Sequence, residues 1–331
     1  MPDETQSAEE RLIARYFGPL ATDPGAFGLI DDAAILTPPD GCDLVLTTDG
    51  VIAGVHFFPD DPPATIGRKA LRMNLSDLAA KGARPQGFLL ALAVPAATDA
   101  DWLAAFAAGL GEDARLYGCP LLGGDTDRTP GLVSVSITAF GTVPHGKMVR
   151  RSTAKAGDAI VVTGTIGDAA LGVKMRRDPS LARRLRLSDQ QAGHLGRRYL
   201  LPEPRNAIAD AVLRHASAAM DISDGLAGDL AKLCRASEVA AQIDVARVPL
   251  SDAARVAVAA EPGLIETVLT GGDDYEILLT LPPERLSSFR SDAEASGVTV
   301  SEIGAIQAGE SAHFMREGKA LTFARPSYSH F

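Results

Sequence analysis

Hydrophobic and polar positions alternate regularly near the middle of the chain and predict a strand there. Residues 132–140 place Val133, Val135 and Ile137 on one face and hydroxyl side chains on the other. This pattern is typical of a half-buried antiparallel strand. Short apolar runs bounded by Gly, Thr or Ser predict further strands. These runs lie at 44–50, 160–162, 241–248 and 275–281, with a short strand leading into a helix at 219–225.

Other segments repeat with the period of a helix. Residues 65–81 begin at a capping threonine and are followed by a glycine, as helix ends often are. Asn74 and Asp77 are three residues apart on this helix and therefore share a face. A second helix is predicted from Thr98 to the region of Tyr117. Shorter helices are predicted at 8–17, 168–174 and 204–216.

The 331 residues, 46% of them hydrophobic, are enough for two domains with proper cores. The polar, basic stretch 144–157 is the best candidate boundary. Beyond it, strands and helices alternate. The sequence therefore predicts one domain at 1–149 and a second, α/β domain at 150–331.

Charge and cysteine content narrow the class of protein. The formal net charge of −10 disfavours binding to nucleic acid or to anionic membranes, and a phosphate ligand would need a divalent cation to offset the repulsion. Cys42, Cys119 and Cys234 are far apart, so neither a disulfide framework nor a zinc site is expected.

The start of the chain lacks an apolar signal core. The apolar run 88–97 has only about half the length of a membrane span. A cytoplasmic protein is expected.

Aspartates recur beside Gly, Thr or Ser, mostly at predicted strand ends. Each alone has an ordinary explanation, since Asp favours turns and caps, and Asp77 could belong to a solvated helix face. Together they point to a cation, because two carboxylates about 4 Å apart repel by very roughly 4 kcal/mol at a moderate dielectric. Oxygen ligands without a Cys or His cluster favour Mg²⁺, Mn²⁺ or Ca²⁺. The acidic groups are Asp31–Asp32, Asp49, Asp77, Asp125, Asp221–Asp224 and Asp273–Asp274.

A calcium loop does not fit these acids. Asp125, Asp127 and Thr129 would occupy positions 1, 3 and 5 of an EF-hand, but Pro130 would stand at position 6 and Ser136 at position 12. Those positions need Gly and Glu. Mg²⁺ typically takes one or two carboxylates together with substrate phosphates, which suits dispersed aspartates and phosphoryl transfer.

Other catalytic motifs are absent from the sequence: GxxxxGK[ST], GxSxG, HExxH and the kinase HRD signature. The glycine loop 164–167 fits a tight turn better than a dinucleotide site. His56, one short loop after Asp49, is as compatible with a structural role as with a site. Arg151 lies in a basic stretch that is either a solvated linker or a source of a phosphate-binding arginine.

The motifs, in order over nearly the entire chain, resemble those of the thiamine-monophosphate kinase family. NLSDLAAKGA, GGDT and DISDGL are shared with the wider superfamily of aminoimidazole-ribonucleotide and selenophosphate synthetases. VHF, the early RYF and GGDDYE favour the thiamine-phosphate branch. The motifs that carry the resemblance are IARYF, DDAAIL, TTDGVIAGVHF, KALRMNLSDLAAKGARP, LLGGDT, RSTAKAGD, VTGTIGDAALG, MDISDGL and GGDDYE.

The resemblance implies ATP-dependent, in-line phosphorylation of thiamine monophosphate to thiamine diphosphate, with several Mg²⁺ ions. It also implies a mixed α/β fold of two domains. The N-terminal sheet would pair into a barrel in a homodimer, with ATP bound near the interface, and the C-terminal domain would be an α/β sandwich.

Site residues carry over motif by motif, and Asp49, Asp77 and Asp125 would be the catalytic ones. The implied metal ligands are Asp32, Thr47, Thr48, Asp49, Asp77, Asp125, Asp221 and Asp224. The implied ATP contacts are Tyr117, Gly124, Asp125, Arg151 and Ser223. The implied contacts to thiamine phosphate are His56, Asp273 and Tyr328.

Three positions depart from the family pattern. Ile30 stands where GxGDD has its second glycine, Asp273 replaces the Glu of GGEDYE, and the ending at 327–331 only approximates GxDHF. Substrate contacts at Asp273 and Tyr328 are affected most. Two other functions remain open from the sequence: an ATP-using synthetase acting on an amidine or another oxygen nucleophile, and a non-catalytic nucleotide-binding maturation or regulatory protein.

Overall fold

A computed structural model describes residues 7–325 and 327 of the chain. It divides into two compact units, which we describe separately. Unit 1 comprises Met1–Leu78 and Arg84–Gly146, and unit 2 comprises Ala79–Ala83 and Lys147–Phe331. The change from Gly146 to Lys147 falls inside the basic stretch 144–157. The short segment Ala79–Ala83, which ends the first long helix, belongs to unit 2.

Unit 1 is built on a four-stranded sheet with the order β1-β4-β2-β3. β1 (Cys42–Ile52) and β2 (Arg84–Pro95) both run antiparallel to β4 (Ser134–Pro144), and β3 (Leu121–Thr129) lies parallel to β2. The antiparallel strand predicted at 132–140 is thereby confirmed, two residues later at its start.

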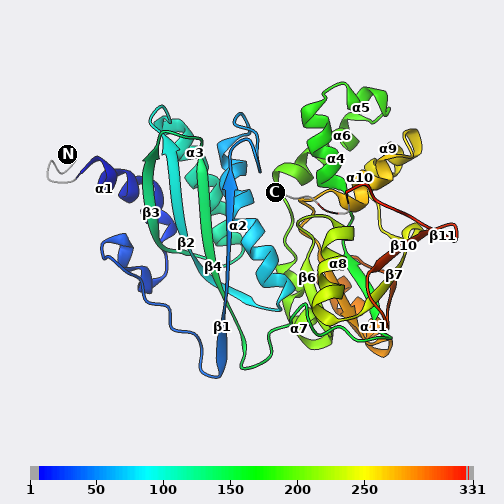
Figure 1. Cartoon of the computed structure of the whole chain (residues 1–331). Coiled ribbons are helices and arrows are strands. Elements are labelled where there is room, and N and C mark those ends of the chain that lie inside the picture. The colour runs from blue at the N-terminus through cyan, green and yellow to red at the C-terminus, as the bar shows by residue number, and fades with distance from the viewer. Residues whose placement is uncertain (1–6, 326, 328–331) are drawn as a thin grey trace. The chain divides into compact units, whose positions relative to one another are not determined.

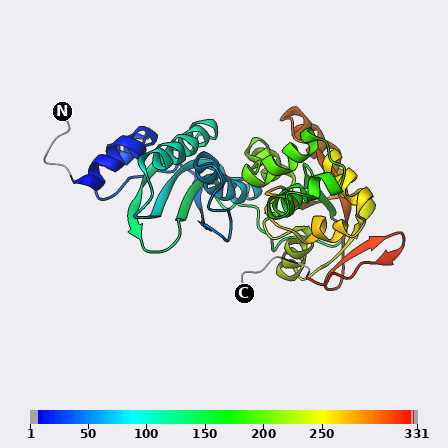
Figure 2. The same cartoon turned by 90° about the horizontal axis from the view of Figure 1, so that it is seen from above.

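Two long helices, α2 (Pro63–Ala80) and α3 (Ala100–Leu116), cover one face of this sheet (Figures 1 and 2). They confirm the two long helices of the sequence analysis. Burial alternates along β4, where Val135, Ile137 and Ala139 are buried beneath the helices. The N-terminal segment consists of short helical pieces: α1 (Ala8–Leu12), η1 (Ile13–Phe17), η2 (Gly18–Leu20) and η3 (Pro24–Leu29).

The prediction that the recurring aspartates lie at strand ends is wrong for Asp49 and Asp125. Asp49 lies inside β1 opposite Ile137, and Asp125 lies inside β3 opposite Ala91. Pairing along the full length of the neighbouring strands extends both strands through sequences that, alone, favour turns. Sheet pairing overrides such local preferences.

Unit 2 contains a mixed seven-stranded sheet with the order β11-β10-β7-β9-β5-β8-β6. The interior strand β5 is buried throughout, with Ala159 and Val161 in a hydrophobic cluster on one face and Ile160 and Val162 in a cluster on the other. A sheet covered on both faces reads as a continuous apolar run, and such runs predicted β5, β6, β7 and β8. The strands β9, β10 and β11 were not predicted. The strands are β5 (Ala159–Thr163), β6 (Ala218–Asp221), β7 (Ala240–Asp244), β8 (Ile277–Leu281), β9 (Val300–Gln307), β10 (Ala312–Arg316) and β11 (Lys319–Ala320).

Helices lie on both faces of the second sheet (Figure 1). Residues of α4, α8, α9 and α10 belong to one hydrophobic cluster, and residues of α7 and α11 to the other. The helices are α4 (Asp168–Arg177), α5 (Leu181–Arg184), α6 (Asp189–Leu200), α7 (Ala209–His215), α8 (Leu226–Ser237), α9 (Asp252–Ala260), α10 (Leu264–Thr270) and α11 (Leu286–Ala295). One-turn 3₁₀ helices are η4 (Asn206–Ile208), η5 (Val245–Arg247) and η6 (Pro283–Arg285). Within residues 7–325, no helix is long and apolar enough to cross a membrane.

Candidate functional site

Strand β1 and helix α2 bring three of the implied metal ligands together in unit 1. Between residues 71 and 80 of α2, Asp77 alone is not buried. The hydroxyl of Thr47 donates to its carboxylate across 2.5 Å. Asp49 lies two residues after Thr47 and therefore on the same face of β1. This strand face thus presents a hydroxyl and a carboxylate beside the carboxylate of the helix.

Thr48 points to the opposite face of β1, since side chains alternate along a strand. Its hydroxyl donates to the carbonyl oxygen of Ile137 at 3.1 Å and accepts from the hydroxyl of Thr138 at 3.1 Å. The structure therefore does not bring the Thr48 hydroxyl together with Thr47 and Asp77.

A cavity of about 710 Å³ in unit 1 gathers a second set of predicted residues. Asp32, Gly124 and Asp125 line it, although Asp32 is some 90 positions away from the other two in the chain. The carboxylate of Asp125 accepts a hydrogen bond from the backbone N–H of Thr126 at 2.9 Å. Apolar side chains from the N-terminal segment and the sheet complete the wall. These include Phe17, Leu29, Leu36, Leu89 and Phe140.

The turn before Asp32 accommodates the departure at Ile30. Ile30 has a φ of −105° and is 91% exposed, so its backbone conformation needs no glycine. Positive φ angles fall instead on Phe27, Gly28 and Leu29. The left-handed turn is thus completed before the position at which the family pattern has its second glycine.

His56 and Tyr117 are both tied to structural partners in unit 1. The ring Nδ1 of His56 accepts from the backbone N–H of Ile52 at 3.1 Å, which closes the loop after β1. Tyr117 caps the C-terminus of α3, and the guanidinium of Arg72 lies over its ring at 5.7 Å. Arg72 is buried and makes two hydrogen bonds, at 2.5 and 3.0 Å, to the fully buried carboxylate of Asp113.

In unit 2, the DISDG loop connects β6 to α8 and carries Asp221, Ser223 and Asp224. The fully buried Asp229, in the first turn of α8, accepts from the backbone N–H groups of Ser223 and Asp224, both at 2.9 Å. Its other oxygen accepts from Lys232 at 2.8 Å, and Lys232 also pairs with Asp224. Burial raises the pKa of Asp229, and the contact with Lys232 opposes this rise.

The segment 271–276 lies directly against the DISDG loop. The backbone N–H groups of Asp273 and Tyr275 donate to the carbonyls of Ser223 and Ile222 at 2.9 and 2.8 Å. A Cβ on Gly272 would lie 2.3 Å from the Ser223 carbonyl oxygen, so this close approach requires glycine. The structure thus brings Asp273 and Ser223, predicted from separate motifs, to one place.

Asp274 is a fully buried acid next to this segment. One carboxylate oxygen accepts from the backbone N–H of Gly167 at 2.8 Å, and the other has no hydrogen-bond partner among the described residues. Burial raises the pKa of Asp274 well above its usual range, and the nearby charge of Asp168 adds to the rise. Glu276, also fully buried, is held by Arg198 at 2.9 Å and by Arg205. The buried contacts of Asp274 and Glu276 thus fix the position of the segment 271–276.

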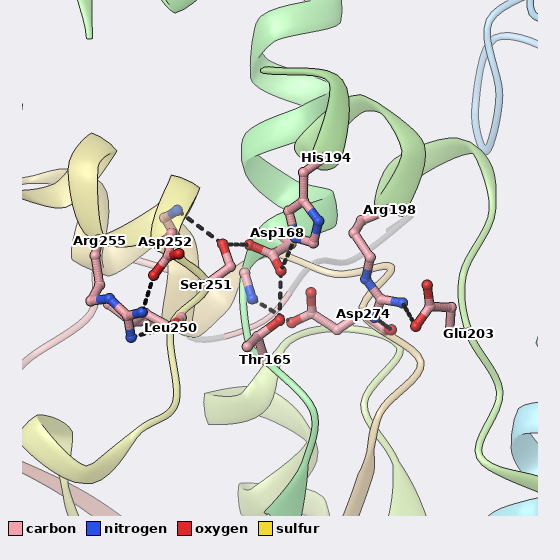
Figure 3. Close-up of polar contacts among 12 residues, drawn as sticks. Thr165, Asp168, His194, Arg198, Glu203, Leu250, Ser251, Asp252, Arg255 and Asp274 are labelled. Atoms are coloured by element: carbon pink, nitrogen blue, oxygen red, sulfur yellow. Dashed lines mark hydrogen bonds and ion pairs between the residues drawn. The ribbon is translucent and has the colours of Figure 1, made fainter. Parts of the chain in front are cut away.

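A polar cluster around Asp168 supports the start of α4 (Figure 3). Its carboxylate contacts Ser251 at 2.5 Å, Thr165 at 2.6 Å and His194 at 2.9 Å. Burial alone would raise the pKa of Asp168, but the hydrogen bonds from His194, Ser251 and Thr165 outweigh it and lower the pKa.

The remaining predicted positions are less informative. Arg151 is exposed, and its carbonyl oxygen accepts from the hydroxyl of Ser237 at 2.8 Å. Tyr328 lies outside the described residues. The sequence analysis missed Arg72, Asp113, Asp229 and Lys232. Each is a charged residue among apolar residues of a helix. The sequence alone does not distinguish a charged residue that makes internal contacts from one that is simply exposed.

The donor chemistry of the predicted ligands suits Mg²⁺, since carboxylates and hydroxyls are hard oxygen donors. Six of these residues lie in unit 1, and Asp221 and Asp224 lie in unit 2. In the described part of the chain, no three His, Cys, Asp or Glu side chains are grouped closely enough to hold a metal. Mg²⁺ commonly takes only one or two carboxylates and completes its shell with water and phosphate oxygens, so the donor set remains compatible.

The fold and the site together define a two-domain protein of the AIR synthase-related class. The family model described as AIR synthase related protein, N-terminal domain, matches residues 30–143, and the model for the C-terminal domain matches residues 155–316. A HypE hydrogenase maturation protein in complex with ATP has a TM-score of 0.79 but only 21% identity, which shows a shared fold alone.

Closer relatives define the particular family. The thiamine-monophosphate kinase of Caulobacter vibrioides is 42% identical, with 96% of this chain and 89% of that protein covered. The one of Escherichia coli K12 is 39% identical over 98% of both chains. The crystal structure of the Stenotrophomonas maltophilia kinase has a TM-score of 0.83 at 37% identity, covering 94% of this chain and 96% of that one. The structure of AaThiL complexed with AMPPCP and TMP has a TM-score of 0.78 at 28% identity, covering 99% and 100%. The chain belongs to the thiamine-monophosphate kinase family.

Proposed function

We propose that this protein transfers the γ-phosphoryl group of ATP to thiamine monophosphate and thereby forms thiamine diphosphate. The observation that carries the proposal is the cavity in which Asp32, Gly124 and Asp125 meet, in a chain whose relatives are thiamine-monophosphate kinases. One structural relative was solved with AMPPCP, a non-hydrolysable ATP analogue, and with TMP.

The aspartates of unit 1 can hold the cations that offset the negative charge of the two substrates in this reaction. In the reaction, the terminal phosphate oxygen of thiamine monophosphate attacks the γ-phosphorus of ATP, and the bond from that phosphorus to the β–γ bridging oxygen breaks. Both reactants are anions, so carboxylates at the site are useful only as holders of cations. Bound Mg²⁺ would neutralise and orient the phosphate oxygens. Several Mg²⁺ ions are proposed, and the residues that would hold them are Asp32, Thr47, Thr48, Asp49, Asp77, Asp125, Asp221 and Asp224.

The protein's own groups would position the two substrates. Phosphoryl transfer needs in-line alignment more than covalent help. Tyr117, Gly124, Asp125, Arg151 and Ser223 are the proposed contacts to ATP. His56 and Asp273, with Tyr328, are the proposed contacts to thiamine phosphate. The hydrogen bond between the Asp273 N–H and the Ser223 carbonyl supports a shared role for these two motifs.

We further propose a cytoplasmic homodimer in which the sheet of unit 1 pairs with its counterpart to form a barrel. The face of this sheet away from α2 and α3 exposes Leu46, Ile52 and Leu89 by 59%, 42% and 37%. Exposed apolar groups on one face of a sheet are typical of an interaction surface.

The proposed reaction is tested by incubating the purified protein with ATP, MgCl₂ and thiamine monophosphate, and by measuring ADP and thiamine diphosphate. Asp125→Asn should lower turnover by at least a hundredfold, because it removes a charge from the cation-holding set while preserving shape. Asp127→Asn, two residues further along the same strand, is the matched control and should keep most of the activity. Absence of thiamine diphosphate with the wild-type protein would refute the assignment.

A further inference from the structure

Lys232 lies at an unusual place for a cation. It belongs to the first two turns of α8, and its side chain reaches back to the loop before the helix, where it contacts Asp224. The N-terminal end of a helix carries partial positive charge and favours anions. A lysine is therefore unfavourable there unless nearby carboxylates compensate for its charge.

Two carboxylates provide that compensation. The ammonium group of Lys232 lies 2.8 Å from Asp229 and also contacts Asp224. Asp229 is fully buried, and its position is fixed by the N–H groups of Ser223 and Asp224. Asp229 thus holds the backbone of the loop, while Lys232 holds the side chain of Asp224.

The exposure of these groups differs in a way that leaves Lys232 room to move. The Asp224 and Lys232 side chains are 34% and 31% exposed, whereas Asp229 has no exposure. The buried acid is a fixed anchor. The lysine has a flexible four-carbon stem and can withdraw into solvent without breaking the hydrogen bonds between Asp229 and the loop.

We propose that Lys232 is an internal counterion of the DISDG loop. It neutralises Asp224 when no divalent cation is bound and releases this carboxylate when Mg²⁺ binds, and so it sets the Mg²⁺ concentration at which the site fills. The inference rests on the proposed function only in treating Asp224 as a Mg²⁺ ligand. It makes Lys232 a positioning residue and not a catalytic one.

The direction of the effect follows from charge. Lys232 must be displaced from Asp224, and its single positive charge remains near the bound Mg²⁺. At a separation of roughly 5 Å in a water-like dielectric, this repulsion weakens binding on the order of tenfold. Removing the charge should therefore strengthen Mg²⁺ binding.

The test is calorimetric titration of MgCl₂ into the full-length protein, with and without AMPPCP. Lys232→Met should bind Mg²⁺ about tenfold more tightly than the wild type. Lys232→Arg keeps the charge and should stay within about twofold. Lys174→Met, at an exposed lysine of α4, should leave the affinity unchanged. Urea unfolding without Mg²⁺ verifies that each variant is folded.

A double-mutant cycle tests the link to Asp224 directly. In an Asp224→Asn background, Lys232→Met should raise Mg²⁺ affinity less than in the wild-type background, because no contact between Lys232 and Asp224 has to be broken. Unchanged or weaker binding by Lys232→Met alone, or an equal effect in both backgrounds, would overturn the inference. Thiamine monophosphate is not used in these titrations. A shifted affinity without turnover would thus reject only the proposed kinase reaction, whereas turnover without the shift would reject only the counterion.

Discussion

Asp168 is a buried carboxylate that remains ionised because three side chains hydrogen-bond to it. Burial favours the neutral acid, but His194, Ser251 and Thr165 stabilise the anion more strongly and lower its pKa below the usual 3.8. The pKa in the unfolded chain is the higher of the two. Ionised Asp168 therefore stabilises the fold above about pH 4, and this contribution is lost as the pH falls through the lowered pKa of the folded state.

Thr165→Val tests this contribution. The substitution keeps the shape but removes a donor 2.6 Å from the carboxylate. The free energy of unfolding at pH 7 should fall by about 1.5–3 kcal/mol, as for hydrogen bonds to charged groups. The difference from wild type should shrink as the pH falls below 4 and through the lowered pKa of the folded state, because the acid then becomes protonated in both proteins. Urea unfolding across this pH range measures it, with exposed Thr322→Val as the control. A difference independent of pH would contradict the role given to Asp168.

The aspartates of this chain fall into two groups, buried ones and cavity-lining ones, which the sequence does not distinguish. Asp168, Asp229 and Asp274 are buried and organise loops, whereas Asp32 and Asp125 line a cavity. Asp168, Asp229 and Asp125 each follow a glycine, and Asp32 and Asp274 are each the second of two adjacent aspartates, so local composition cannot separate the buried acids from the cavity acids. Their difference comes from contacts with residues far away in the chain, as between Asp168 and Ser251.

Two adjacent glycines in β3 show how closely the strands of unit 1 approach each other. A Cβ on Gly124 would lie 1.8 Å from the carbonyl oxygen of Leu90 in β2, whereas one on Gly123 would meet only the Leu89 side chain at 3.4 Å. Gly124 is therefore required by the pairing of the strands, in addition to its proposed contact with ATP.

We expect Gly124→Ala to destabilise the protein by about 1–3 kcal/mol, because the strands must separate locally. Gly123→Ala should be tolerated, since its new methyl makes an ordinary van der Waals contact. Thermal unfolding in the absence of nucleotide separates this effect from any loss of ATP binding. Equal stability of the two variants would show that the close approach of Gly124 to Leu90 is not a constraint.

Helices α2 and α3 are joined by a buried ion pair, Arg72–Asp113, next to Tyr117, a proposed ATP contact. Asp113→Asn would leave the Arg72 guanidinium, 7% exposed, without its compensating charge. Breaking a buried pair in this way costs about 3–5 kcal/mol, and Tyr117 beneath Arg72 should lose its fixed orientation. Glu112→Gln is the matched control, because its pair with Arg68 is exposed and should contribute less than about 1 kcal/mol. Chemical denaturation compares both variants with wild type.

Periodicity predicted the kind of about half of the helices and strands but not their extent, and it did not predict β2, β3, β9, β10 or β11. The long helices α2 and α3 and the alternating strand β4 follow from local pattern alone. β1 and β3 continue through Thr-Thr-Asp-Gly and Gly-Gly-Asp-Thr because each is paired with a long neighbouring strand. Strand length here is decided by the partner, which a single stretch of sequence does not contain.

At the scale of the whole molecule, family motifs indicated the site better than physical patterns did. The motif resemblance selected Asp32, Gly124 and Asp125, which the structure places in one cavity. Composition and charge alone predicted only an acidic protein that binds a divalent cation. Lys232 lies in none of the motifs, and the motif that contains Arg72, KALRMNLSDLAAKGARP, gives this arginine no role. Both were missed because each acts through contacts that only the folded chain creates.

The apolar sheet face of unit 1 gives the last prediction. Leu46 lies on the face opposite Thr47 and the helices, and its 59% exposure is unfavourable in a monomer. Leu46→Asp should convert a dimer of twice 34.5 kDa into monomers, because a carboxylate cannot be buried between two apolar sheet faces without a large desolvation penalty. Light scattering after size exclusion measures the mass. Leu116→Asp is the matched control, since Leu116 is 66% exposed at the end of α3 and away from this face. A monomeric wild type, or a dimeric Leu46→Asp variant, would show that the exposed face has another role.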